Sequence, residues 1–329
     1  MSGGRLLLAV AGLACLLLVP RVTSAQSFIT AWGSYGSGDG QFKTPVGIAI
    51  GGSGDIYVTD VYSDRVQVFS STGAFLRQWY WPGEYNIAVD ANENVYMVGP
   101  SYPGSPVSGV VRFTRTGTYL GHWDAYPNRW GSIAIDASGN VYVSGSSGSA
   151  AAPLIQVFTP FGESLREWST QSDTAVGSPA ADGLAVDASG NVYVACPYAS
   201  RIQKFANDGT FIAQWGGGAP DGRFEPIRVA IGPDGRVYVV DAGARVQVFT
   251  SDGAFVTMWG SSGVANGQFE DPLGIAVDAQ SDSYVVDSLN NRIQKFGPGP
   301  TPTLSSTWGA LKNRYRGARG AEAPPSQAK

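Results

Sequence analysis

The sequence predicts an all-β protein folded as a six-bladed β-propeller, with four short strands in each blade. One strand pattern recurs six times along the 329 residues at a spacing of 39 to 51 residues, and periods of this length are typical of repeat architectures. The chain also holds 44 glycines, and only 15% of its residues are charged. This composition suits many short strands joined by tight turns.

The first strand of each repeat is short and apolar, without polar alternation. Its six copies begin at Gly47, Asn86, Ser132, Gly183, Arg228 and Gly274. An apolar run of this kind suits the innermost strand of a blade, which neighbouring blades cover on both faces. The third residue is alanine in every copy, as at Ala49, and we interpret it as a limit on side-chain size near the crowded axis.

Three further strands complete each repeat. The second centres on a tyrosine, the third ends on a phenylalanine and the fourth ends on a tryptophan, as at Tyr57, Phe69 and Trp79. Turns rich in Gly, Asp and Asn separate these strands, as in residues 136–140. Strands rich in β-branched and aromatic residues between such turns predict one propeller blade for each repeat.

Several runs in the first and last repeats resemble the NHL repeat. They are Gly40-Gln-Phe42-x-x-Pro45, Asp60-x4-Arg65-Val-Gln67 and the related Gly267-Gln-Phe269 and Asp287-x4-Arg292-Ile-Gln294. The resemblance covers nearly all of residues 28–296. It implies a six-bladed propeller of NHL-type blades, in agreement with the six copies of the pattern.

A surplus strand predicts how the ring closes. Residues 28–32 end on Trp32 and precede the first repeat, and a similar segment ending on Trp308 follows the last. After Phe296 the chain contains three prolines between residues 297 and 302, and prolines obstruct a tight hairpin. We therefore expect residues 28–32 to supply the outer strand of the sixth blade.

The N-terminal residues 1–25 are predicted to be a signal peptide. Arg5 provides the positive charge, an apolar run of 14 residues follows, and small residues precede a cleavage site at Gln26. Such a run is too short to span a bilayer well. A lipoprotein signal with Cys15 as the lipidated residue is the alternative. After cleavage we expect no transmembrane segment and a secreted or periplasmic location.

The rest of the chain divides into residues 26–300, the propeller, and residues 301–329, a Pro-rich linker and basic tail. Residues 26–309 contain 15 Lys and Arg against 25 Asp and Glu, whereas residues 310–329 carry a net charge of +4. An acidic body repels phosphate backbones, so nucleic acid is excluded as a partner. Cys196 is the one cysteine left after cleavage, and no intrachain disulfide is expected.

Aspartate and arginine recur together at the junction of the second and third strands. The repeats that carry both contain Asp60 with Arg65, Asp241 with Arg245, and Asp287 with Arg292. Repeats two and three lack both residues, and repeat four has Arg201 with Cys196 in place of the aspartate. Because repeats one, five and six carry both residues and repeats two and three carry neither, we predict structural Asp–Arg pairs rather than a ligand site.

No metal, cofactor or catalytic residue is assigned from the sequence. The aspartates after the first strand, Asp90, Asp136, Asp187 and Asp278, suit turn capping. They supply one carboxylate per blade, whereas calcium takes six to eight oxygens. The sole histidine, His122, lies at a position that varies among the repeats, and Cys196 is interpreted as a packed thiol.

Aromatic residues outside the repeat period predict a recognition surface on blades two and three. They are Trp81, Tyr85, Tyr102, Tyr126 and Trp130, with Arg129 beside them. Exposed aromatics next to an arginine suit a protein or glycan partner. The alternative is that these repeats are degenerate and their loops loosely packed.

The function expected from these features is a non-enzymatic scaffold that binds a protein or glycan of the cell envelope or extracellular space through one face. The alternative is a metal-dependent lyase or hydrolase with a site in the central channel, because similar folds host such enzymes. Virginiamycin-type lyases depend on histidines that this chain lacks, and the metal-binding Glu/Asn/Asp set of gluconolactonase-like hydrolases has no place in the sequence.

Overall fold

The computed structural model describes residues 26–83, 86–99, 109–125, 131–146, 153–170, 181–218 and 222–299. All of these residues belong to one structural unit, Ala25–Gly299. The predicted signal peptide and C-terminal tail lie outside the described residues.

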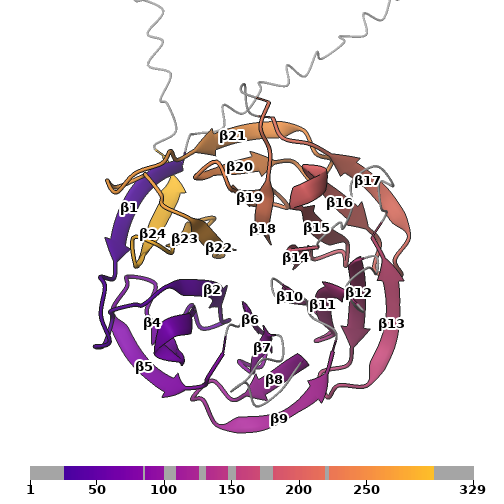
Figure 1. Ribbon diagram of the computed structural model, residues 1–329. Coiled ribbons are helices and arrows are strands. Elements are labelled where there is room, and N and C mark those ends of the chain that lie inside the picture. Colours follow the sequence, from indigo (N-terminus) through magenta and orange to yellow (C-terminus); the bar gives the residue numbers. More distant parts are fainter. Residues whose placement is uncertain are drawn as a thin grey trace, which may run out of the picture. The chain divides into compact units, whose positions relative to one another are not determined.

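The described chain forms six antiparallel sheets of four strands each, arranged as the blades of a ring (Figure 1). Blade 1 contains β2 (Pro45–Ile50), β3 (Ile56–Asp60), β4 (Arg65–Phe69) and β5 (Phe75–Tyr80). Blade 2 contains β6 (Asn86–Val89), β7 (Val95–Gly99), β8 (Gly109–Phe113) and β9 (Tyr119–Asp124). Blade 3 contains β10 (Ile133–Ile135), β11 (Val141–Ser146), β12 (Pro153–Phe158) and β13 (Ser164–Ser169).

The remaining blades repeat this order. Blade 4 contains β14 (Gly183–Val186), β15 (Val192–Cys196), β16 (Arg201–Phe205) and β17 (Phe211–Trp215). Blade 5 contains β18 (Pro226–Ile231), β19 (Val237–Asp241), β20 (Arg245–Phe249) and β21 (Phe255–Trp259). Blade 6 contains β22 (Pro272–Val277), β23 (Ser283–Asp287) and β24 (Arg292–Pro298), and the short 3₁₀ turns η1 (Val61–Ser63) and η2 (Pro197–Ala199) lie in blades 1 and 4. The predicted all-β, six-bladed architecture is confirmed.

The N-terminal strand β1 (Gln26–Trp32) is the outer strand of blade 6. It pairs antiparallel with β24, from Gln26 opposite Pro298 to Trp32 opposite Ile293, so the first and last described strands lie side by side in the ring (Figure 1). The predicted closure is confirmed, with a strand that begins two residues earlier than expected. A register shift between Phe28 and Thr30 marks a bulge at Ile29.

Antiparallel pairing places two kinds of loop on the same face of the ring. The loops from the second to the third strand and the loops from a fourth strand to the next blade share one end of the blades, which we call the upper face. Backbone hydrogen bonds join the two kinds in blade 1, from Val61 N to Thr44 O and from Tyr62 N to Lys43 O. The turns between first and second and between third and fourth strands form the lower face.

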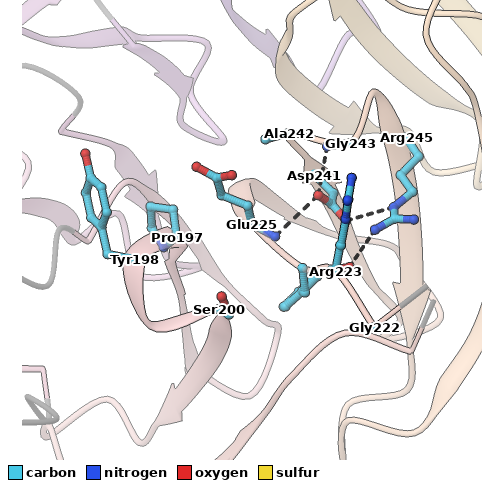
Figure 2. A pocket seen from close by; sticks show the side chains of 11 residues that line it. Pro197, Tyr198, Ser200, Gly222, Arg223, Glu225, Asp241, Ala242, Gly243 and Arg245 are labelled. Atoms are coloured by element: carbon cyan, nitrogen blue, oxygen red, sulfur yellow. Dashed lines mark hydrogen bonds and ion pairs between the residues drawn. The ribbon is translucent and has the colours of Figure 1, made fainter. Parts of the chain in front are cut away.

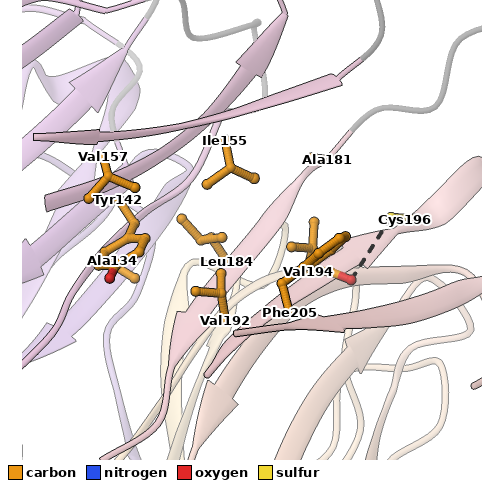
Figure 3. Close-up of a cluster of buried hydrophobic side chains, with 10 residues drawn as sticks. All are labelled: Ala134, Tyr142, Ile155, Val157, Ala181, Leu184, Val192, Val194, Cys196 and Phe205. Atoms are coloured by element: carbon orange, nitrogen blue, oxygen red, sulfur yellow. Dashed lines mark hydrogen bonds between the residues drawn. The ribbon is translucent and has the colours of Figure 1, made fainter. Parts of the chain in front are cut away.

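The hydrophobic core lies between neighbouring blades. The cluster in Figure 3 combines Ala134 and Tyr142 of blade 3 with Leu184 and Cys196 of blade 4. The tyrosine of every second strand is at most 1% exposed, and burial of a large side chain contributes about 1.5–3 kcal/mol. The small alanine of the first strand is buried at 8% exposure in this cluster, as expected for a side chain near the axis.

The fourth-strand tryptophans pack on glycines of the next blade. A Cβ atom added to Gly73 would lie 2.7 Å from the Trp32 ring, so only glycine leaves room for the contact. Gly73 also has φ +86°, a conformation that glycine adopts at no steric cost. The same contact recurs between Gly117 and Trp79, Gly162 and Trp123, Gly209 and Trp168, and Gly253 and Trp215.

Candidate functional site

The structure brings all three predicted Asp–Arg pairs together. Each aspartate ends a second strand and lies opposite the arginine that begins the third strand in the ladder. The distances from arginine Nε to aspartate Oδ2 are 3.1 Å for Asp60 and Arg65, 2.9 Å for Asp241 and Arg245, and 2.6 Å for Asp287 and Arg292. The carboxylates are at most 2% exposed. Burial makes these contacts far more consequential than surface ion pairs.

A glutamine accompanies each pair, a role that was not predicted from the sequence. We call each set of Asp, Arg and Gln a clamp, and the three clamps are Asp60–Arg65–Gln67, Asp241–Arg245–Gln247 and Asp287–Arg292–Gln294. The glutamine Nε2 donates to the aspartate Oδ2 at 2.7 Å in blade 5 and 2.9 Å in blade 6. The Arg-x-Gln spacing places both side chains on one face of the third strand, a signal that was present in the sequence.

Each clamp holds the loop that enters its own blade from the preceding one. In blade 1, Asp60 Oδ1 accepts a hydrogen bond from Lys43 N at 2.6 Å. Arg65 Nη2 and Gln67 Nε2 both donate to the carbonyl oxygen of Gln41, at 2.6 and 2.7 Å. The clamp therefore satisfies loop backbone groups that no strand partner reaches.

The clamped loops insert a phenylalanine into the core. Phe42 is fully buried against Phe69, and Phe269 is fully buried against Phe296. This arrangement explains why the Gly-x-Phe run and the Asp-x4-Arg run occur in the same repeats. The loop supplies the aromatic side chain, and the clamp fixes the backbone that carries it.

Trp81 takes the place of this phenylalanine in blade 2. Its ring contacts Phe113 at 4.9 Å and stacks on Tyr119 at 5.7 Å, and the side chain is half-buried. Trp81 thus packs against the core of blade 2 while part of its side chain stays exposed, and its role as a partner contact stays a prediction. The other predicted contacts, Tyr85, Tyr102, Tyr126, Arg129 and Trp130, lie outside the described residues.

Blade 4 has a cysteine where the other clamps have their aspartate. Cys196 is 2% exposed and packs in the cluster of Figure 3. Burial raises the pKa of its thiol to about 12, so the nucleophilic thiolate is scarcely populated near neutral pH. The structure thus places Cys196 in the core, away from any role in covalent chemistry.

The aspartates after the first strand bind turn backbones. Asp90 Oδ1 accepts hydrogen bonds from Asn92 N and Asn94 N at 2.9 and 2.8 Å, and its Oδ2 accepts one from Tyr96 Oη at 3.1 Å. Asp136, Asp187 and Asp278 make the equivalent turn contacts. Across the described ranges, no three His, Cys, Asp or Glu side chains are grouped to hold a metal ion.

Exposed apolar side chains recur on the upper face. Tyr62, Tyr198 and Leu289 occupy the same position in their loops, two residues after the second strand of blades 1, 4 and 6. They are 72%, 61% and 56% exposed. The fold does not need these side chains for its core, and they are therefore available for contacts with a partner.

A groove of about 600 Å³ crosses the upper face between blades 4 and 5. Figure 2 shows Tyr198 and Ser200 on one side of the groove and the clamp residues Asp241 and Arg245 on the other. Glu225 projects between them, and its backbone N–H donates to Asp241 Oδ1 at 3.3 Å. The groove combines an exposed aromatic ring with hydroxyl and carboxylate groups, which suits a polar ligand or a partner's loop.

The central channel carries a buried charge at its mouth. We define this mouth by the residue that begins the apolar repeat motif in each blade, and these residues are Gly47, Asn86, Ser132, Gly183, Arg228 and Gly274. Arg228 is 6% exposed, and burial lowers the pKa of its guanidinium to about 10. Its strand was predicted to be apolar, and an arginine at a position that is glycine in three repeats was the signal in the sequence for this charge.

Asp182 lies beside Arg228, and burial disfavours the ionised form of its carboxyl group. Burial raises the pKa of its carboxyl to about 6 despite the attraction of Arg228. Its Oδ1 is buried and makes no hydrogen bond within the described part of the chain. The ionised form is therefore less favourable in the folded state than in the unfolded state.

Asp182→Asn is expected to stabilise the protein near neutral pH. Because the pKa of Asp182 is raised on folding, its contribution to the free energy of unfolding falls as pH rises from its ordinary pKa to about 6. The variant removes this penalty, so it should gain about 2 kcal/mol at about pH 7 and nothing below about pH 4. Urea denaturation at both pH values measures the difference, and an equal effect at both would contradict the assignment.

His122 lies on the outer strand β9 and is exposed. Its Nδ1 contacts the hydroxyl of Tyr119 on the same strand. The outer strand is the part of a blade farthest from the channel, so this imidazole does not reach the channel mouth.

No helix in the part of the chain that the structure describes is long and apolar enough to cross a bilayer.

Comparisons with known proteins agree with the repeat and the fold. Residues 42–69, in blade 1, match the family described as the NHL repeat. A segment of 44 residues is 46% identical to the B-box type zinc finger protein ncl-1 of Caenorhabditis elegans, and this match covers 13% of the chain and 5% of that protein. The chain thus carries an NHL repeat within a six-bladed propeller.

Solved structures similar to this chain include proteins with different activities. A Bacteroides thetaiotaomicron protein of unknown function superposes with a TM-score of 0.63 at 19% identity, over 83% of this chain and 76% of its own. A gluconolactonase of Xanthomonas campestris gives 0.58 at 17% identity over 79% and 87%. A virginiamycin B lyase of Staphylococcus aureus gives 0.54 at 12% identity over 78% and 96%. At these identities the similarity shows the fold alone.

Proposed function

We propose that this NHL-repeat propeller is a secreted or periplasmic scaffold that binds a protein or glycan through its upper face and carries out no chemistry of its own. One observation carries the proposal: Tyr62, Tyr198 and Leu289 are exposed at the same loop position of three blades. The location follows from the signal peptide predicted at residues 1–25.

Buried clamps hold two of these loops in place before a partner arrives. Tyr62 lies two residues after Asp60, and Leu289 lies two residues after Asp287, both aspartates being buried. Aromatic side chains provide a large contact area with few rotatable bonds. A preorganised loop loses little conformational entropy on binding, which favours affinity.

The placement of His122 and Cys196 supports a binding role. His122 is exposed on an outer strand, and Cys196 is a buried thiol with a pKa of about 12. Neither side chain lies at the channel mouth or in the groove between blades 4 and 5. The exposed loop residues of the upper face are therefore the better basis for a function.

Replacement of both exposed tyrosines should weaken binding to the partner. Tyr62→Ala combined with Tyr198→Ala removes contact area without touching the core, and loss of central aromatic contacts typically weakens an interface by about tenfold or more. Capture of partners from a periplasmic or extracellular fraction, and binding to an immobilised glycan panel, measure the effect. Phe161→Ala is the matched control, because Phe161 is 78% exposed on the lower face. Equal losses in both variants would refute the choice of face.

An enzyme with its site in the central channel is the second candidate. Arg228 and Asp182 place charged groups at the channel mouth, with the pKa of Asp182 raised to about 6. The fold is similar to a virginiamycin B lyase and a gluconolactonase. Stoichiometric calcium or zinc in the purified protein would favour this candidate over the scaffold.

A further inference from the structure

We propose that the mouth of the central channel binds a carboxylate group, with the guanidinium of Arg228 as its receptor. The site is separate from the exposed loop residues of the upper face, so it does not depend on the partner bound there. Three observations support this site: the contacts of Arg228, the cavity beside Arg228 and the charges around Arg228.

Arg228 spans the channel mouth between opposite blades. Its Nε donates to Asn86 Oδ1 of blade 2 at 3.3 Å, although Arg228 belongs to blade 5. Its Nη1 donates to the carbonyl oxygens of Asp182 and Ile227 at 2.8 and 2.9 Å. Two neutral carbonyls and an amide hold the guanidinium in place without neutralising its charge.

The charge of Arg228 has no counter-ion in contact. In the described ranges no carboxylate oxygen forms an ion pair with it, and no acceptor contacts its Nη2. The carboxylate of Asp182 lies nearby and attracts the guanidinium electrostatically. The hydrogen bond from Arg228 to Asp182, however, goes to the backbone carbonyl and not to the carboxylate. A buried cation without a contacting anion is costly, and a bound anion would offset this cost.

A cavity lies next to the guanidinium. It is lined by residues in or next to the inner strands of all six blades, including Arg228, Asn86 and Ser132, and measures about 60 Å³. One water molecule needs about 15 Å³ of such space, so the cavity has room for about four heavy atoms, the size of acetate. Gly183 lets the inner strands of blades 4 and 5 approach closely beside it, because a Cβ on Gly183 would lie 2.9 Å from the Cα of Arg228.

The chemistry of the site selects a carboxylate among small ligands. A guanidinium presents parallel N–H groups that match the two oxygens of a carboxylate. A single arginine and a cavity of this size do not suit a multiply charged phosphate ester. Ser132 lines the same cavity, and a serine hydroxyl is a further donor for an anionic oxygen.

Isothermal titration of the full chain with sodium acetate, at constant ionic strength, tests the proposal. A ligand of four heavy atoms is expected to bind with a Kd of order 1 mM. Arg228→Gln should weaken binding by at least about tenfold. Arg236→Gln is the matched control, since Arg236 pairs with Asp234 in an exposed turn, and it should leave the affinity unchanged.

Asp182→Asn provides a test that does not remove the receptor. It deletes the negative charge beside Arg228, so acetate should bind about three times more tightly or better at about pH 7. A tripeptide with a free C-terminal carboxylate, compared with its amide, then distinguishes a peptide end from a free small acid as the ligand. Cooperative thermal unfolding of each variant shows that it is folded.

Three results would overturn the proposal. They are no heat of binding in the unmodified protein, equal affinity in a folded Arg228→Gln variant, and weaker binding after Asp182→Asn. Equal binding to both arginine variants would show general ion binding rather than a channel site.

Discussion

Deletion of residues 26–32 should lower the melting temperature by about 10 °C or more. The deletion removes β1, which pairs with β24 along its whole length and completes blade 6. It also removes Trp32, whose ring lies 5.9 Å from Phe69 of blade 1 and 6.2 Å from Tyr284 of blade 6. Loss of large packed side chains costs about 3–5 kcal/mol each, and each kcal/mol lowers the melting temperature by about 2 °C in a chain of this size.

Two point variants distinguish the effect of ring closure from the effect of removing seven residues. Trp32→Ala removes the contact with blade 1 but keeps the strand, and it should cost about 3 kcal/mol. Ile29→Ala changes a residue of the same strand that is 51% exposed at the bulge, and it should cost less than about 1 kcal/mol. Calorimetry of both variants measures the difference. A melting temperature unchanged by Trp32→Ala would mean that β1 does not close the ring through this contact.

The sequence predicted the fold because each blade is encoded locally. Four strands and their turns lie within one repeat, and the position of Tyr57 or Phe69 within its repeat sets its place in the blade. The closure by residues 28–32 was also predictable, since the surplus strand ending on Trp32 had one partner left at the other end of the array. The structure adds that five of these tryptophans pack on a glycine of the next blade, as Trp32 packs on Gly73.

The functional sites were less predictable because they depend on contacts between distant loops. The Asp60–Arg65 pair was visible as a spacing, but the role of Gln67 required the path of the loop that carries Gln41. Trp81 was interpreted as a contact residue since it breaks the repeat period, and the structure adds that its half-buried ring packs on Phe113 as a loop phenylalanine does in other blades. A repeat pattern shows which sequence positions are equivalent. It does not show that a residue at a different position can occupy the same place in the fold.

The channel mouth also depends on contacts between residues far apart in the sequence. Arg228 was grouped with apolar strands because three of its four strand residues fit the pattern. Its contact with Asn86 joins residues 142 positions apart in the chain, which no local pattern encodes. A residue that departs from the repeat near the axis therefore indicates a feature of the channel, because the six copies of that position surround one channel.

Replacement of Asp287 should be the most damaging single change in the clamps. Asp287 Oδ1 accepts a hydrogen bond from Glu270 N at 2.7 Å, and Oδ2 accepts from Arg292 and Gln294 at 2.6 and 2.9 Å. Asp287→Ala leaves the Glu270 N–H and the Arg292 Nε–H without this acceptor in a buried site, and the loss of one partner of a buried ion pair costs about 3–5 kcal/mol. Urea denaturation measures the change in the free energy of unfolding.

Two further variants show whether the cost comes from the uncompensated charge. Asp234→Ala removes an aspartate whose pair with Arg236 is more than a third exposed on each side, and it should cost about 1 kcal/mol or less. Asp287→Ala with Arg292→Met removes both charges and should recover part of the stability lost in the single variant. A double variant as unstable as the single one would assign the loss to the loop hydrogen bonds made by Asp287 instead. In that case the clamp would act mainly through the backbone of residues 268–270, the segment that positions Leu289 through Glu270 on the upper face.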